Sequence, residues 1–388
     1  MKRIFMKIKT PIITCIALNT SLCLASDNHC DYVVPSSHYL VDGASLQLEP
    51  GATICLEQGE RGPLRITSLQ GTENNPIVIR NENGVVTTRP YEYSIAIENS
   101  KHVRLTSVSG QEGNPYGVRL GGTLSIGALS SHVEVENIEI YRARFAGMLI
   151  KTDPNCDPAT WAENFTMAGV HIHDNYIHNT EEGEGMYIGY TGKSRKLTCD
   201  GQNIEVFPHK LTDVNIHNNR LAQIAADGIQ LNSVKGNSRI ALNSIYRTGV
   251  SPFSPYWQNT GIQVGGDDVE VSHNTIYKSG GNGMMLDGDN LRILNNKIIF
   301  AGENGIFARN QAQQTGVITG GEPHVYSKNV IIQSASYGIK LYATHTRAAH
   351  LISENTIENF GELDAANRPM TYSLLNQDVA VNLVNNQH

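Results

Sequence analysis

The chain lacks the marks of several protein classes. Its formal net charge is −7, so it has no basic footprint for nucleic acid. A strongly acidic polymer would need a local basic patch, because the field of the whole protein opposes it. After the first 25 residues, no stretch is long and apolar enough to span a bilayer, and no CxxC spacing suggests a metal site. We therefore expect neither a nucleic-acid partner nor a membrane span.

The first residues have the composition of a secretory signal. The apolar stretch Pro11–Ala25 is too short to cross a membrane, and it follows a basic start formed by Lys2, Arg3, Lys7 and Lys9. We predict a signal peptide over residues 1–25 and a secreted or periplasmic protein over 26–388. The alternative is a buried first helix. Cleavage would remove four positive charges and change the net charge from −7 to −11.

A repeated segment is the main positive feature of the chain. It recurs at Thr212–Asn232, Asp268–Asp287 and Asn290–Arg309: an alternating apolar run, an Asn, a second short apolar run, and a Gly followed by renewed alternation. Alternation with period two indicates strands. The repeat of 22 to 24 residues holds three short strands and three turns, which is one rung of a parallel β-helix. We predict an all-β chain that forms a single solenoid.

The two ends of the solenoid need caps, because an open end would pair with other chains. We assign residues 27–60 to an N-terminal cap and residues 361–388, where the pattern is lost, to a C-terminal cap or a tail along the side. Between them, an Asn recurs at the same place in successive rungs. Because Asn tolerates a left-handed backbone and bonds to its neighbours, we predict that these residues form a turn and a ladder of amides: Asn175, Asn219, Asn243, Asn274, Asn296, Asn329 and Asn355.

Four cysteines remain after the predicted signal. An oxidising compartment permits disulfides, and four cysteines allow three pairings. Cys156 and Cys199 lie in equivalent loops of successive rungs, and Cys30 and Cys55 both belong to the cap region. We therefore predict the pairs Cys30–Cys55 and Cys156–Cys199, with free thiols or a metal site as the alternatives.

The Gly-containing rungs and the Asn ladder resemble the right-handed parallel β-helix of the pectin/pectate-lyase-like superfamily. The resemblance covers nearly all of residues 26–388 and implies a right-handed solenoid with an N-terminal cap. It also implies that substrate lies across the first strand of each rung, which by register is the strand after the Gly. The superfamily contains polysaccharide lyases, polygalacturonases, alginate epimerases and non-catalytic phage and adhesin domains, so the resemblance implies a fold and not one activity.

The outward columns of this first strand combine amides, carboxylates, aromatic rings and a few bases, which suits sugar hydroxyls. Glu184 and Asp227 fall on neighbouring rungs in one column, and Tyr187 lies beside them. We predict these three as catalytic residues. The predicted substrate-binding residues are Lys151, Gln230, Asn232, Trp257, Gln263, Asn282, Asp287, Arg309 and Lys340. The simpler alternative is a solvated sheet face.

Three insertions flank the same place. Lys151–Gly169 and Tyr190–Leu211 follow the strand on consecutive rungs, and Gly249–Asn259 precedes it with the aromatic residues Phe253, Tyr256 and Trp257. We expect these loops to wall a groove, because long loops in compact folds are usually functional and aromatic rings pack on pyranose faces. Otherwise the aromatic loop folds down and buries its rings.

Two adjacent carboxylates can act in several ways. Their repulsion raises one pKa and gives an acid and a base near neutral pH. They could instead hold calcium, the one cofactor we consider. In a lyase, Tyr187, Lys151 or Arg309 could take the α-proton of a uronate whose carboxylate a cation neutralises.

No single enzyme family fits the motifs. Asp227 resembles the first catalytic Asp of polygalacturonases, but Gln258–Thr260 stands where their paired Asp would be, and Asn282 stands where they carry a His. The Asp-Pro-His-Asp run of mannuronan epimerases and the Lys/Arg motifs of alginate lyases are absent. His171 and His173 lie off the predicted face, and surface histidines are the favoured interpretation over a metal site.

The sequence thus predicts a monomeric, secreted carbohydrate-active protein that acts on an extended polysaccharide as a lyase, hydrolase or epimerase. The alternatives are a non-catalytic glycan-binding or cell-surface protein with the same groove, and a purely structural spike.

Overall fold

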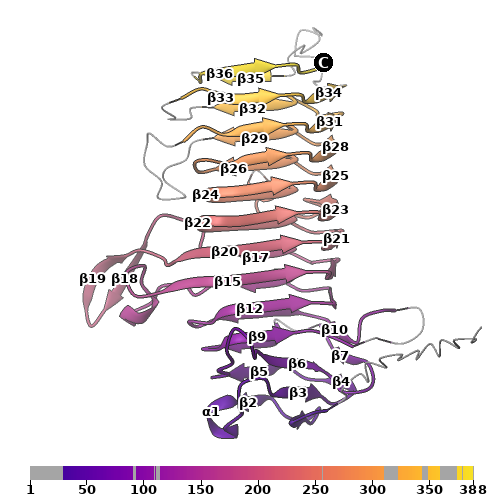
Figure 1. The fold of residues 1–388 in the computed structure, drawn as a ribbon, viewed down its shortest axis with the longest axis vertical. Coiled ribbons are helices and arrows are strands. Elements are labelled where there is room, and N and C mark those ends of the chain that lie inside the picture. The colour runs from indigo at the N-terminus through magenta and orange to yellow at the C-terminus, as the bar shows by residue number, and fades with distance from the viewer. Residues whose placement is uncertain are drawn as a thin grey trace, which may run out of the picture.

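In the computed structural model, the described residues are 29–90, 93–108, 110, 114–255, 257–309, 322–342, 348–358, 374–377 and 379–387. The predicted signal peptide therefore lies outside them. Each rung of a tall solenoid contributes up to three strands, and successive rungs stack in parallel (Figure 1). None of the described helices is long and apolar enough to cross a membrane.

The first strands of the rungs form one face of the solenoid. They pair in parallel from the N-terminal to the C-terminal end in the order β2 (Leu40–Asp42), β5 (Leu64–Thr67), β8 (Tyr93–Glu98), β11 (Thr123–Gly127), β14 (Met148–Ile150), β17 (Met186–Ile188), β22 (Ile229–Ala241), β24 (Ile262–Ser272), β26 (Met284–Asp287), β29 (Ile306–Arg309), β32 (Ile339–Tyr342) and β35 (Leu374–Gln377).

The long strands β22 and β24 run through both the first face and the second. The second strands of the rungs form this second face. Its members are β1 (Tyr32–Val34), β3 (Thr53–Leu56), β6 (Ile77–Asn81), β9 (Lys101–Leu105), β12 (Ser131–Glu136), β15 (Thr166–His173), β20 (Lys210–His217), the later parts of β22 and β24, β27 (Arg292–Leu294), β30 (Val325–Ser327), β33 (His350–Ser353) and β36 (Val381–Val384).

The third strands form a separate sheet of β4 (Gly59–Arg61), β7 (Val86–Thr88), β10 (Val118–Leu120), β13 (Ile138–Tyr141), β16 (Tyr176–His178), β21 (Arg220–Ala222), β23 (Ser244–Thr248), β25 (Thr275–Ser279), β28 (Lys297–Ala301), β31 (Val330–Ile332) and β34 (Thr356–Glu358). A short helix, α1 (Gly43–Leu46), lies at the N-terminal end, and a 3₁₀ turn, η1 (Pro158–Thr160), and an antiparallel hairpin, β18 (Arg195–Cys199) and β19 (Gln202–Val206), project from one side (Figure 1).

Inward residues of successive rungs stack into one continuous apolar core. The inward position at the start of the first strand is fully buried in every rung from β14 to β32: Met148, Met186, Ile229, Ile262, Met284, Ile306 and Ile339. Each buried side chain of this size contributes about 1.5–3 kcal/mol. The alternation in the sequence therefore correctly predicts which residues face the core.

The predicted Asn ladder is present. Each ladder amide donates from Nδ2 to the Oδ1 of the next ladder residue over 2.9–3.1 Å, from Asn175 to Asn355. The ladder continues to Asn386, which the sequence pattern did not reveal. Because β35 and β36 also pair with β32 and β33, the described part of the last segment stacks as one more rung.

The expected turn role of the ladder residues is wrong in one respect. The left-handed residue at this corner is the one before each Asn, as at Asp174 (φ 55°), Leu242 (φ 58°) and His273 (φ 58°). The Asn itself supplies hydrogen bonds that link three rungs: Asn274 Nδ2 donates to the carbonyl of Ile240 and to Asn296. The preceding residue therefore makes the sharp turn, and the Asn satisfies the backbone groups that the turn exposes.

The ladder should contribute strongly to stability. Asn296→Ala would remove the side-chain acceptor of the Asn274 backbone N–H, one of the acceptors of Asn274 Nδ2, and the side-chain donor to the Val271 carbonyl, so we expect a loss of about 3 kcal/mol in the free energy of unfolding. The matched control is Lys297→Ala, whose side chain is exposed one residue later and which should change stability by less than about 0.5 kcal/mol. Urea denaturation measures both; equal effects of the two variants would contradict a stabilising ladder.

Candidate active site

Strand pairing brings the predicted first-strand residues into register. Leu149, Tyr187, Gln230, Gln263, Met285, Phe307 and Lys340 are successive partners along one column. Glu184 and Asp227 are neighbours in the column before the Gly, because Gly185 donates its backbone N–H to the carbonyl of Asp227 over 2.9 Å. We call Glu184, Tyr187, Asp227, Gln230, Thr260 and Gln263 the floor.

Most of the floor is buried and only Tyr187 is partly exposed, in contrast to the open face expected from the sequence. Glu184 is 1% exposed and Asp227 is 0% exposed. The physical consequence is electrostatic: a carboxylate without water around it is destabilised relative to the neutral acid.

Burial raises the pKa of Glu184 to about 7, and the positive charge of Lys151 opposes the shift only in part. One carboxyl oxygen, Oε2, has no hydrogen-bond partner. Glu184 is thus poised to exchange a proton near neutral pH, as a general acid or base requires.

Asp227 is also shifted toward its acid form. Burial raises its pKa well above the ordinary range, and the neighbouring Glu184 carboxylate raises it further, while a hydrogen bond from the Thr260 backbone and the charge of Arg309 act in the opposite direction. The Thr260 N–H donates to Oδ1 over 2.6 Å, and Oδ2 has no partner. The two carboxyls therefore titrate as a coupled pair.

Unsatisfied oxygen atoms are concentrated at this place. Buried side-chain oxygens without a hydrogen-bond partner occur on three consecutive rungs and the loop between them: Glu184 Oε2, Asp227 Oδ2, Gln230 Oε1, Gln258 Oε1, Thr260 Oγ1 and Gln263 Oε1. Buried polar atoms are normally bonded, and each exception costs about 1–3 kcal/mol. Such a cluster is expected where a ligand or ordered water supplies the missing partners.

Lys151 and Tyr187 form one end of the site. The Lys151 ammonium lies 4.6 Å from the centre of the Tyr187 ring and 2.9 Å from Oδ1 of Asp153. Tyr187 also contacts Phe145 edge-on at 6.3 Å. Tyr187 is therefore held between a cation and an aromatic ring, beside the rung that carries Glu184.

The other end of the site contains a buried ion pair. Arg309 donates to both carboxylate oxygens of Asp287, at 3.0–3.2 Å, and its guanidinium lies 4.7 Å from the ring centre of Trp257. Asp287 and Arg309, predicted separately as substrate-binding residues, thus satisfy one another. The pair positions the Trp257 ring above the first-strand face.

The remaining predicted binding residues differ in their roles. Asn232 donates to Thr191, as Gln230 does. Asn282 bonds to Glu303 and Asn304, which makes it a structural link. Lys340 lies 5.0 Å from the Phe307 ring centre, at the C-terminal end of the face.

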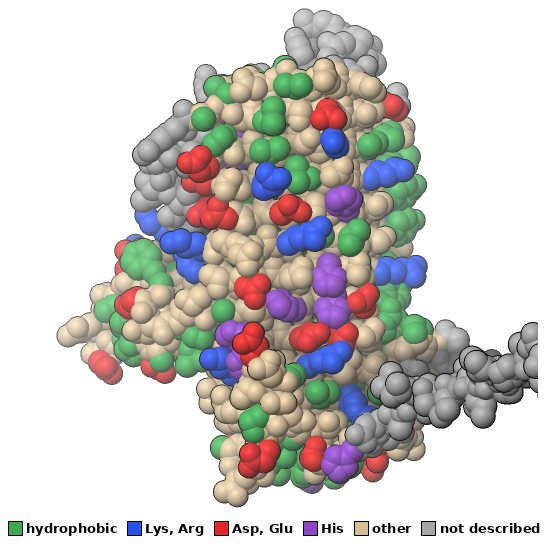
Figure 2. Space-filling view, viewed as in Figure 1, with side chains coloured by type: hydrophobic (Ala, Val, Ile, Leu, Met, Phe, Trp, Pro, Cys, Tyr) green, Lys and Arg blue, Asp and Glu red, His purple; other side chains and the backbone are tan. Residues whose placement is uncertain are grey.

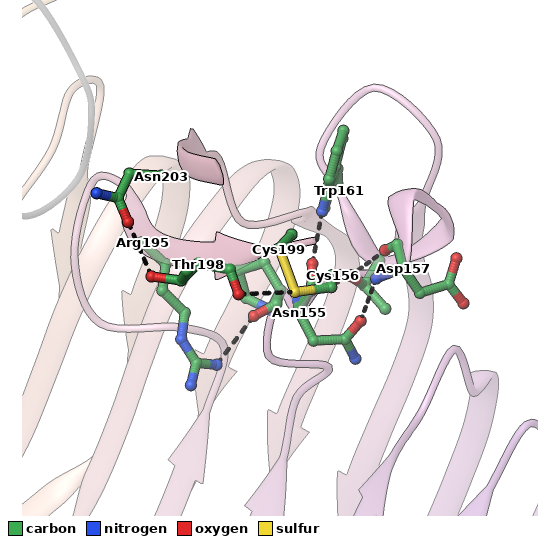
Figure 3. The surroundings of a disulfide bond; sticks show 10 residues. Asn155, Cys156, Asp157, Trp161, Arg195, Thr198, Cys199 and Asn203 are labelled. Carbon is green, nitrogen blue, oxygen red and sulfur yellow. Dashed lines mark hydrogen bonds between the residues drawn. A yellow bond between two sulfur atoms is a disulfide. The ribbon is translucent and has the colours of Figure 1, made fainter. Parts of the chain in front are cut away.

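The insertions do flank the floor. The β18–β19 hairpin is joined to the loop after β14 by the disulfide Cys156–Cys199, with Cα atoms 5.5 Å apart. Arg195 adds a 2.9 Å hydrogen bond to the carbonyl of Pro154 (Figure 3). The second predicted disulfide, Cys30–Cys55, is also formed.

The aromatic loop keeps its rings at the surface. Phe253 is 57% exposed and Trp257 is 42% exposed, and Phe253 contacts Phe145 at 6.2 Å. Tyr256 lies outside the described residues. The loop therefore did not fold down to bury these two rings.

Sequence reasoning missed several residues of the site. In the sequence, Thr260 stands out only as a departure from polygalacturonases. In the structure, its backbone N–H donates to Asp227 and its hydroxyl has no hydrogen-bond partner. Thr191 bridges two amides, and Asp153 pairs with Lys151. Thr191 and Asp153 lie in the insertions, which was the available signal.

His173 belongs to an ion-pair network on the second face. Its ring nitrogens lie 3.1 Å from Glu134 and 2.7 Å from Asp174, and it stacks on His217 at 4.7 Å. Arg104 pairs with Glu136 in the same cluster. Acidic, basic and histidine side chains alternate over this face (Figure 2). These charges are mutually paired, as expected for a solvated sheet face.

Comparisons with known proteins agree with the architecture. A family model described as "Right handed beta helix region" matches residues 200–363. The structure of an alginate lyase from Paenibacillus sp. str. FPU-7 superposes with a TM-score of 0.54 at 16% identity, covering 82% of this chain and 99% of that chain. The chain is a right-handed parallel β-helix.

Two other solved structures align over most of this β-helix. One is a family 6 polysaccharide lyase from Pseudopedobacter saltans, with 12% identity, 90% and 92% coverage and a TM-score of 0.40. The other is a lacto-N-biosidase from Eubacterium ramulus, with 12% identity, 93% and 68% coverage and a TM-score of 0.39. TM-scores this low do not establish that these chains share the fold. No curated protein sequence matches the chain.

The raised pKa of Glu184 makes stability depend on pH. The unfolded carboxyl ionises near its ordinary value of 4.5, but the folded one ionises near 7, so stability is full below about pH 4.5 and falls as the pH rises through 7. Glu184→Gln cannot ionise and should be more stable than the wild type by up to about 3 kcal/mol at pH 8, with little difference at pH 4.

Urea denaturation at both pH values measures this effect. Glu163→Gln is the matched control, because Glu163 is exposed and should show no pH-dependent gain. A Glu184→Gln gain that is equal at the two pH values would show that ionisation of Glu184 is not its cause.

Proposed function

We propose that the protein is an exported carbohydrate-active enzyme that binds an extended polysaccharide across β17, β22 and β24 and cleaves or remodels it. The observation that carries this proposal is the pair of buried carboxyls, Glu184 and Asp227, on neighbouring rungs, each with an oxygen that lacks a partner. A purely structural pair would be an unstable choice, because the fold could use neutral residues there without the desolvation cost.

The pair has the properties of an acid and a base. Burial shifts both carboxyls toward their protonated forms, so Asp227 can donate a proton to a leaving oxygen, whereas Glu184, with a pKa of about 7, is partly ionised near neutral pH and can accept a proton. Tyr187 lies on the same rung as Glu184 and can serve as a second proton carrier, with Lys151 close to its ring.

A glycan is the ligand that suits the surroundings of the pair. The floor offers amide and hydroxyl groups on successive rungs, which are about 4.8 Å apart, and sugar hydroxyls need such partners. Phe253 and Trp257 supply exposed ring faces beside it, and pyranose rings pack well on aromatic rings.

Export and a monomeric state complete the proposal. The two disulfides suit an oxidising compartment, as does the predicted signal peptide. The described strands of the solenoid pair with other strands of the same chain, which favours a monomer.

A panel of polysaccharides tests the activity, read both as new reducing ends and as unsaturated products. Asp227→Asn and Glu184→Gln should each lower kcat/KM by at least about 100-fold, while both variants still bind the polymer. Lys297→Ala, at an exposed position on β28 of the third sheet, serves as the control and should retain activity within about threefold. Binding with no turnover of any polymer would instead support the alternative, a non-catalytic glycan-binding protein.

The aromatic loop should contribute to binding more than to chemistry. Trp257→Ala removes a ring that is exposed beside the floor, so we expect KM to rise about tenfold with kcat nearly unchanged. Phe165→Ala is a control, because Phe165 packs against the core and contacts His209; it should lower stability and leave KM unaltered. A Trp257 effect confined to kcat would contradict a binding role.

A further inference from the structure

The two cations beside the floor, Lys151 and Arg309, already have carboxylate partners. Lys151 lies 2.9 Å from Asp153, and Arg309 is bonded to both oxygens of Asp287. Lys340 has no carboxylate partner among the hydrogen bonds and ion pairs of the described residues, but its column position is four rungs from Gln230, or about 19 Å. Among the residues that the structure describes, the carboxyl pair therefore has no uncompensated positive charge beside it.

The unsatisfied atoms of the floor and of Gln258 include both acceptors and donors. Three of the six are amide oxygens, which accept hydrogen bonds, two are carboxyl oxygens, which accept when ionised and donate when protonated, and the sixth is the hydroxyl of Thr260. A sugar hydroxyl can partner all of them, because it donates and accepts without carrying charge.

We infer that the floor takes a neutral, hydroxyl-rich glycan and excludes polyuronates. The inference rests on the proposed function, since it names the substrate class of the same site. It departs from the activity stated for the alginate lyase that shares the fold, a likeness that shows the fold alone.

Electrostatics provides the reason for the exclusion. A polyuronate brings one carboxylate with every sugar, and the floor would place one of these charges beside Glu184 and Asp227 in a site without solvent. The ionised form of Glu184 would repel this charge strongly, because little water screens the two carboxylates there. Lys151 and Arg309 each already face one carboxylate, Asp153 and Asp287, so an added ligand carboxylate would leave the local charge negative.

A neutral glycan meets no such penalty. Its hydroxyls can donate to Gln230 and Gln263 and can donate to or accept from the carboxyl pair, so that these buried groups gain the partners they lack. Its apolar ring faces can pack on Phe253 and Trp257, which border the floor.

Binding without turnover tests the inference. The Asp227→Asn protein is titrated calorimetrically with hexasaccharides from a β-glucan, a β-galactan, polygalacturonate and alginate, with and without calcium. We expect a neutral oligosaccharide to bind with an affinity that changes less than about twofold between low and high salt. Binding or cleavage of a polyuronate in preference to every neutral polymer, with or without calcium, would overturn the inference and leave the proposed function standing. Binding of no polymer would overturn both.

A charge variant tests the cause of the exclusion. Asp153→Asn leaves Lys151 without its carboxylate, so affinity for polygalacturonate should rise at least about tenfold at low salt and fall again at high salt. The double variant Lys151→Met, Asp153→Asn keeps the same loop change but lacks the cation, and it should bind polygalacturonate no better than the parent. An equal rise in both variants, or no rise in either, would refute the assigned role of the Lys151–Asp153 pair.

Discussion

The hydrogen-bonded register between successive rungs is the constraint on which everything else depends. Because each rung pairs in parallel with the next, a residue's column fixes its neighbours above and below. The buried ladder from Asn175 to Asn386 holds this register at one corner, since its amides bond both to one another and to backbone carbonyls of adjacent rungs. A slip by one residue would turn every inward Ile or Met toward solvent, so the apolar columns and the ladder enforce the same alignment. The solenoid can then carry long insertions at a few rungs without losing its core.

The same register places two carboxyls next to each other at positions that are buried from solvent. On most rungs the column before the Gly tolerates burial well: Asn282 and Asn304 are neutral, and their amides bond along the column. Glu184 and Asp227 break that pattern. Their destabilisation is offset by the rest of the solenoid, whose stability does not depend on any single rung. Because the other rungs stabilise the fold, the site can retain buried carboxyls with raised pKa values, which are destabilising but useful for proton transfer.

The sequence predicts what depends on register alone. Alternation and the recurring Asn and Gly identify the core positions, the ladder, both disulfides and the columns of the first-strand face. It does not predict burial of Glu184 and Asp227, because that depends on how neighbouring side chains and insertions cover the face. It also places Asp287 and Arg309 one rung apart without showing that they bond to each other, since a long Arg side chain has many possible partners. Asn386 escaped notice because the first strand of its rung, Leu374–Gln377, is not preceded by the Gly that marks the repeated rungs.

Charge pairing decides which ligands such a face can accept. A buried amide or carboxyl oxygen that lacks a hydrogen-bond partner favours a ligand that can form that hydrogen bond. A carboxylate ligand instead needs a cation that no other carboxylate already neutralises. Each of the two cations beside the floor already has a carboxylate partner: Lys151 pairs with Asp153, and Arg309 pairs with Asp287. The two acids that satisfy them lie in an insertion and at the end of a first strand, outside the column that holds the carboxyl pair. Selectivity for neutral over acidic glycans can therefore change through these two acids while Glu184 and Asp227 stay the same, which is how one β-helix scaffold can serve different polymers with one arrangement of acid and base.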